Sequence, residues 1–197
     1  MEIILWIVFY LVVWSLFNSY FKWKIFKSGK WKCILFITFF LVSSILFDIL
    51  FYKNLAISIY TLICAMLIST LIGIFFSIFP PFYKHITNGR SFLLWMPSDI
   101  FLQQAMIITA ISILRGYFGT GYSDLYFGLF FITIHLPILF FKWVKLRYLV
   151  VAFTFVLGFI FSYLIRSFGE TGVLIAFLLH FCMYIPVFYY LRDERIV

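Results

Sequence analysis

The sequence predicts an all-α membrane protein, folded as a polytopic bundle of about seven transmembrane helices. Two observations lead to this fold class. Of the 197 residues, 65% are hydrophobic and only 11% are charged, which is too little polar surface to cover a water-soluble globule. Apolar stretches long enough to cross a bilayer also recur along the chain, and a helix needs about 20 such residues to span ~30 Å of hydrocarbon. No linker, repeat or low-complexity tract divides the chain, so we expect one membrane domain over 1–197.

Each predicted span is an apolar stretch bounded by turn-forming or basic residues. The seven spans cover approximately 3–21, 33–52, 55–79, 98–118, 125–141, 148–165 and 173–191. Pro80 and Pro81 end the third span, and Pro97 with Ser98 opens the fourth with a proline and a potential N-cap. The segments "GTGYSD" (119–124) and "SFGETG" (167–172) predict turns between later spans.

Lysine and arginine residues divide unevenly between the two sides of the predicted bundle. Twelve lie on one side, namely Lys22, Lys24, Lys27, Lys30, Lys32, Lys84, Arg90, Lys142, Lys145, Arg147, Arg192 and Arg195. Three lie on the other side, namely Lys53, Arg115 and Arg166. Because positively charged loops remain in the cytoplasm, this bias predicts an external N-terminus and a cytoplasmic C-terminus in the cell membrane.

The charge and the cysteines exclude two other classes of function. The net charge of +8 resides in short loops and not on one soluble face, so a nucleic-acid partner is not indicated. The three cysteines, Cys33, Cys64 and Cys182, lie in apolar runs without a C-x-x-C spacing. This pattern predicts neither a disulfide framework nor a zinc site, and we expect no cofactor.

Polar residues inside the spans are the candidate site, because a polar group in lipid is costly unless it faces the bundle interior. On the predicted topology, Gln103 and Gln104 lie ~8 to 10 Å from the cytoplasmic face, His135 lies ~9 Å from it and His180 ~16 Å. These depths predict one polar pocket in the cytoplasmic half of the membrane. The alternative is that each side chain only hydrogen-bonds a neighbouring helix.

Two charged residues of the fourth span have structural interpretations. Asp99 follows Ser98 in the first turn of the predicted helix, where an acid complements the helix dipole. Arg115, near the outer end of the span, is long enough to reach the membrane interface.

Residues 97–186 carry three segments whose order resembles a known family. They are "PSDIFLQQAMIITAI", "FFITIHLPI" and "VLGFIFSYLIRSFGETGVLIAFLLHFCMY". In this order they resemble the CPBP (CAAX protease and bacteriocin-processing, or Abi) intramembrane proteases. That family has a Glu-Glu-x-x-x-Arg motif, a Phe-x-x-x-His motif and a His-x-x-x-Asn motif on successive helices. The resemblance implies a divergent N-terminal three-helix part over 1–96 and a CPBP-like core over 97–191.

The motifs match the family in part. Phe131 and His135 match the second motif, and His180 matches the histidine of the third. Four positions depart from the pattern, with Gln103 and Gln104 in place of the two glutamates, Ile108 in place of the arginine and Tyr184 in place of the asparagine.

The departures predict a loss of proteolysis. The resemblance implies that a glutamate activates water and that the asparagine helps to stabilise the oxyanion. A glutamine amide cannot act as a general base near neutral pH, and a missing base removes about 10²- to 10⁴-fold of the rate. Our leading hypothesis is therefore a degenerate family member, which serves as a membrane scaffold or binding subunit for a peptide, a lipidated segment or a partner protein.

Two alternatives remain open at the level of sequence. Asp99 lies four residues before Gln103 on the same helix face, so an active endopeptidase built from Asp99, His135 and His180 is one of them. The same alternative could use a metal ion in place of Asp99, but two histidines without a suitable carboxylate lack the third protein ligand that is usual in a catalytic metal site. The other alternative is a substrate-binding subunit of a small-molecule transporter, since small multi-span proteins can serve in this role.

Overall fold

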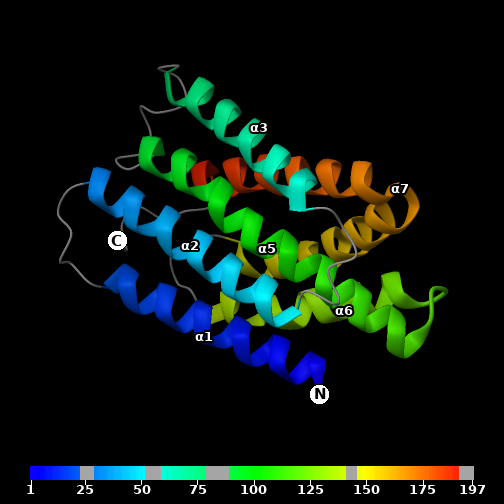
Figure 1. Ribbon diagram of the computed structural model, residues 1–197. Coiled ribbons are helices and arrows are strands. Elements are labelled where there is room, and N and C mark those ends of the chain that lie inside the picture. The colour runs from blue at the N-terminus through cyan, green and yellow to red at the C-terminus, as the bar shows by residue number, and fades with distance from the viewer. Residues whose placement is uncertain (23–28, 52–58, 79–88, 141–145, 191–197) are drawn as a thin grey trace. The chain divides into compact units, whose positions relative to one another are not determined.

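The computed structural model describes residues 1–22, 29–51, 59–78, 89–140 and 146–190, and this part of the chain is helical with short turns (Figure 1). The elements in chain order are α1 (Glu2–Lys22), α2 (Gly29–Phe51), α3 (Ile59–Ile78), α5 (Gly89–Phe118), α6 (Ser123–His135), the 3₁₀-helix η1 (Leu136–Phe140) and α7 (Arg147–Tyr190). Most of the basic loop residues lie outside the described residues, as do Pro80 and Pro81.

Within the described residues, five helical segments are long and apolar enough to cross a membrane. They are Cys33–Phe51, Ile59–Phe76, Leu94–Phe118, Ser123–Phe140 and Arg147–Tyr184. The described apolar part of α1, Glu2–Leu16, is shorter. The chain is thus an all-helical, multi-pass membrane protein, as the sequence predicts, whereas the seven spans and their orientation stay predictions.

The chain separates into two compact units, Met1–Ile113 and Leu114–Val197, and the boundary lies within α5. In the first unit, α1 packs on α5, where the Trp6 indole N–H donates a hydrogen bond to the Met106 carbonyl at 2.9 Å. The fully buried Phe47 of α2 lies 5.1 Å from Phe9 of α1, measured between ring centroids. Burial of these large rings defines the core of the first unit. The predicted subdivision at residues 96 and 97 stays a prediction.

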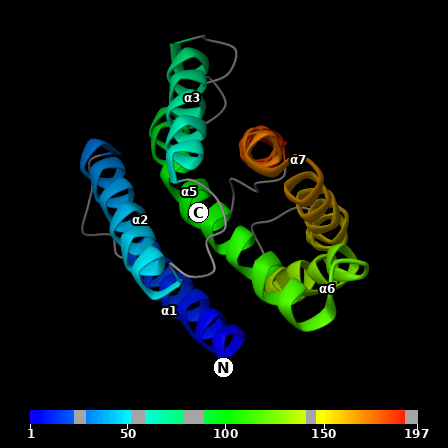
Figure 2. The ribbon, with the colours of Figure 1, turned by 45° about the vertical axis from the view of Figure 1, so that its right-hand side comes forward.

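In the second unit, α6 lies alongside the first half of α7 (Figure 2). The two backbones approach closely at Gly158, where an added Cβ would lie 2.7 Å from the Cβ of Phe131 and 3.1 Å from the Cα of Gly128. Small residues at a crossing point allow such an approach, which is how membrane helices gain packing contacts. The glycines therefore set the spacing of the α6–α7 pair.

Gly169 breaks α7 into two helical segments, 147–168 and 170–190, and the chain reverses there (Figure 1). Its φ of 54° and ψ of −127° lie in a region that only glycine adopts without strain. The return is tight, because an added Cβ at Gly172 would lie 2.0 Å from the Leu164 carbonyl oxygen. The predicted turn at 167–172 is confirmed, and the two segments correspond to the sixth and seventh predicted spans.

The start of the fourth span differs from the prediction. Helix α5 begins at Gly89, and Pro97 lies inside it, so the prediction that Pro97 and Ser98 open the helix was wrong. The proline removes one backbone donor, at a cost of about 3 kcal/mol in a helix interior. Trp95 and Met96, however, are buried on the preceding turn, and their packing offsets that cost. The Ser98 hydroxyl donates to the Trp95 carbonyl at 2.5 Å.

Candidate functional site

The two predicted histidines lie in one cluster of rings within the second unit. His135 is the last residue of α6, and His180 lies in the C-terminal half of α7. Phe131 lies 4.4 Å from His135 and 6.0 Å from Phe161, and Phe161 lies 5.3 Å from His180, all between ring centroids. The α6–α7 hairpin and the reversal at Gly169 thus bring together two imidazoles that are 45 residues apart in sequence.

A backbone hydrogen bond fixes the chemistry of His135. Its Nδ1 atom lies 2.7 Å from the Phe131 carbonyl oxygen, and a carbonyl only accepts hydrogen bonds. We therefore assign the proton of the neutral ring to Nδ1, which leaves the lone pair on Nε2. The ring is half-buried, so Nε2 is an acceptor for an N–H or O–H group of a ligand.

His180 is more enclosed than His135. It is buried, and its ring lies 5.2 Å from that of Tyr184, one turn further along α7. Tyr184 is the residue that the predicted resemblance aligns with an asparagine, and its ring lies against the imidazole. An aromatic ring in this position contributes packing, whereas an asparagine would present an amide donor.

The predicted amides lie on α5 in the first unit. The Gln103 side-chain N–H donates to the Asp99 carboxylate at 2.9 Å, which confirms that these two residues share a helix face. Gln104 is fully buried. Because α5 begins at Gly89, Asp99 lies in the third turn, and the prediction that it sits in the first turn beside the helix dipole was wrong. Its interaction with Gln103 replaces that role.

The predicted pocket therefore has components in both units. Gln103, Gln104 and Asp99 belong to the first unit, while His135 and His180 belong to the second. That these amide and imidazole side chains line one shared pocket remains a prediction. Ile108, which the predicted resemblance aligns with an arginine, is buried in the first unit.

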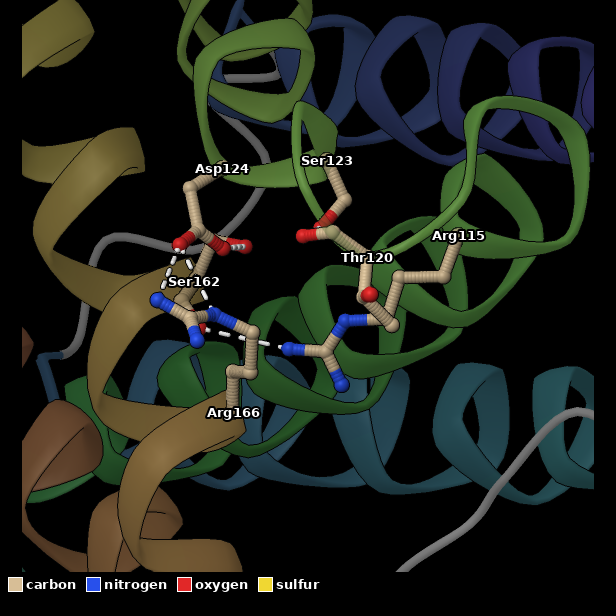
Figure 3. A network of polar contacts seen from close by, with 6 residues as sticks. All are labelled: Arg115, Thr120, Ser123, Asp124, Ser162 and Arg166. Carbon is tan, nitrogen blue, oxygen red and sulfur yellow. Dashed lines mark hydrogen bonds and ion pairs between the residues drawn. The ribbon is translucent and has the colours of Figure 1, made fainter.

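The second unit contains another polar cluster, which the sequence did not predict. We call it the arginine–aspartate network, formed by Arg115, Asp124, Ser162 and Arg166 (Figure 3). The Arg166 guanidinium pairs with the Asp124 carboxylate at 2.9 Å, and the Ser162 hydroxyl donates to the same carboxylate at 2.6 Å. An Arg115 N–H points at the Ser162 carbonyl oxygen at 3.4 Å.

A signal for this network was present in the sequence. Arg115, Asp124 and Arg166 all lie near span ends on the same side of the predicted membrane. Pairing across helices was not foreseen, because Asp124 and Arg166 are 42 residues apart. Arg115, expected to reach the interface, turns its guanidinium against α7.

Metal ligands do not gather in the part of the chain that the structure describes, where no three His, Cys, Asp or Glu side chains form a metal-binding group. Searches of protein-family models, curated proteins and solved structures find no significant match to this chain.

Proposed function

We propose that the protein is a membrane-embedded binding protein related in architecture to the CPBP intramembrane proteases, which holds a peptide, a lipidated segment or a partner protein without cutting it. The observation that carries the proposal is the ring-lined histidine pair of the second unit. His135 offers a hydrogen-bond acceptor at Nε2, and the buried rings of Phe131 and Phe161 pack beside it. The exposed Leu136 and Phe140 of η1, which follow His135 directly in the chain, supply apolar surface. Such a combination suits a ligand with both amide N–H groups and apolar side chains.

The absence of proteolysis follows from the chemistry of the side chains at the motif positions. Gln103 and Gln104 carry amides that cannot accept a proton at neutral pH. Asp99, the carboxylate of the alternative peptidase, already accepts a hydrogen bond from Gln103. Without a general base and an oxyanion donor, hydrolysis by the family route loses about 10²- to 10⁴-fold and a further 10²- to 10³-fold.

We further propose seven spans, with the N-terminus outside and the C-terminus in the cytoplasm of the cell. The excess of basic residues in the first, third and fifth loops supports this orientation. The break at Gly169 supports the number of spans, because each half of α7 has about 20 residues, the length of one span.

Cysteine labelling tests the topology. In a chain whose three cysteines are replaced by serine, Gly121→Cys in the turn before α6 should react with an impermeant maleimide applied from outside. A cysteine added after Val197 should react only after the membrane is opened. The reverse pattern would refute the proposed orientation.

A binding and cleavage assay tests the function. We expect the purified full-length protein to bind a fluorescent farnesylated CAAX peptide in anisotropy measurements and to leave it uncut. His135→Ala should weaken binding about tenfold, which corresponds to one lost hydrogen bond of ~1.4 kcal/mol. Leu129→Ala, which removes an exposed side chain from the same helix, is the matched control and should bind as the unmodified protein does.

The same assay separates the alternatives. Cleavage by the unmodified protein that is lost in both His135→Ala and Asp99→Asn would establish the active peptidase. Under our proposal Asp99→Asn binds the peptide normally, because an asparagine still accepts a hydrogen bond from Gln103.

A further inference from the structure

We propose that the arginine–aspartate network is a binding site for the phosphate group of a membrane phospholipid, with the Arg115 guanidinium as its principal ligand. The inference rests on the charges and contacts of the second unit. It is separate from the histidine pair and does not depend on the function proposed for that pair.

The network has more positive than negative charge. Asp124 is its one carboxylate, and both of its oxygens are engaged. Oδ2 accepts from Nε and Nη2 of Arg166, each at 2.9 Å, and Oδ1 accepts from the Ser162 hydroxyl at 2.6 Å. The negative charge of the carboxylate therefore balances the positive charge of Arg166. The positive charge of Arg115 is not balanced within the network.

Arg115 makes only one long contact in the network, from Nη2 to the Ser162 carbonyl oxygen at 3.4 Å. Its Nε is buried and has no hydrogen-bond partner among the described residues. A guanidinium that is partly withdrawn from water at the end of a membrane span needs an anion, because an unpaired charge there is costly.

The geometry favours a group with several acceptor oxygens. Figure 3 shows Arg115 and Arg166 extending from α5 and α7 toward the same place. Arg115 contacts the carbonyl of Ser162, and the hydroxyl of Ser162 shares the Asp124 carboxylate with Arg166. Guanidinium groups bind phosphate through paired N–H···O bonds, and two neighbouring arginines suit its several oxygens.

The surroundings place the network at the level of lipid headgroups. Exposed aromatic side chains flank it at the end of α5, in the following turn and on α7, namely Tyr117, Phe118, Tyr122 and Tyr163. Tyrosine is enriched where membrane meets water, because its ring is apolar and its hydroxyl is polar. The phosphate available at that depth belongs to phospholipids, although inorganic phosphate has the same chemistry.

Lipid binding by native mass spectrometry tests the proposal with three probes. The full-length protein in a neutral maltoside detergent receives phosphatidylglycerol, a diacylglycerol with the same acyl chains, or inorganic phosphate. We expect one tightly bound phosphatidylglycerol per chain and at least tenfold weaker binding of diacylglycerol, which lacks the phosphate. Inorganic phosphate at millimolar concentration should not displace the lipid.

Variants of the arginine complete the test. Arg115→Gln should weaken phosphatidylglycerol binding about 10- to 100-fold, as expected for the loss of a charge-assisted hydrogen-bonded pair. Arg115→Lys keeps the positive charge but loses the paired N–H donors of the planar guanidinium, so phosphatidylglycerol binding should weaken severalfold. Arg147→Gln removes the arginine at the first residue of α7, away from the network, and should bind as the unmodified protein does.

Three results would overturn the inference. One is tight lipid binding that survives in a folded Arg115→Gln protein, with folding judged by circular dichroism. The second, for the case that Arg115→Gln does not fold, is phosphatidylglycerol binding in Arg115→Lys that equals binding in the unmodified protein. The third is displacement of phosphatidylglycerol by inorganic phosphate, which would assign the site to a free anion.

Discussion

Asp124 is held from two directions, by the Arg166 guanidinium and by the Ser162 hydroxyl, and these contacts join the start of α6 to the middle of α7. Paired and hydrogen-bonded charges are tolerated in a half-buried site, whereas a charge that loses its partner is not. Arg115, Asp124 and Arg166 are recognisable in the sequence as ionisable groups near span ends. Their pairing was not, because it depends on the packing of α6 on α7.

Replacement of Asp124 by asparagine should lower the thermal stability of the protein in detergent. The change leaves two neighbouring guanidinium groups without a carboxylate, and we expect a loss of about 1 to 3 kcal/mol. Thermal unfolding followed by circular dichroism measures it. Glu2→Gln, which removes an exposed acid at the start of α1, is the control. Equal unfolding temperatures in the two variants would show that the network contributes no stability.

The histidine pair illustrates what a sequence can predict at the scale of residues. His135 and His180 were chosen because imidazoles are rare in lipid, and the fold does place both in one ring cluster. The role of Asp99 was not predictable in the same way. It depended on where α5 begins, and the helix continues through Pro97 because Trp95 and Met96 are buried before it.

At the scale of elements, the apolar stretches predict where helices lie better than where they begin and end. Composition determines whether a stretch can enter lipid, and this is read directly from the chain. A proline is a weaker boundary signal, because tertiary packing can offset its cost. Gly169 was a good boundary signal, since the left-handed φ there favours glycine and the turn was predicted.

The close packing of α6 on α7 can be tested by substitution of a glycine at the crossing point. Gly158→Ala should destabilise the protein by about 1 to 3 kcal/mol, because the new methyl group would lie 2.7 Å from the Cβ of Phe131 and force the helices apart. Gly116→Ala is the matched control, since nothing lies within 4 Å of an added Cβ there. Alanine favours a helix over glycine by about 1 kcal/mol, so the control should be neutral or more stable. A Gly158→Ala protein as stable as the Gly116→Ala protein would contradict the close packing.

Most described side chains of α2 and α3 are not buried, and many of the exposed ones are apolar. Ile49 of α2 is 65% exposed and Leu71 of α3 is 66% exposed, whereas Phe47 of α2 is fully buried. In a membrane protein, exposed apolar side chains are solvated by acyl chains, and stability comes from packing between helices. The high apolar content therefore predicts the environment of the protein but not which residues form its core.

The contrast between these positions can be measured. Phe47→Ala should cost about 3 kcal/mol, because it leaves a cavity beside Phe9 and Phe51. Ile49→Ala changes a side chain on the lipid-facing side of the same helix and should cost less than about 1 kcal/mol. Chemical unfolding in detergent compares the two, and similar losses would show that α2 is not packed through Phe47.

The reversal at Gly169 has a consequence for biogenesis. The two arms of α7 are joined by a single non-helical residue, so only a very short connection separates the two apolar segments. We expect the arms to partition from the translocon as a pair. A nascent chain that stops shortly after Gly169 should then leave its first arm poorly integrated and extractable at high pH.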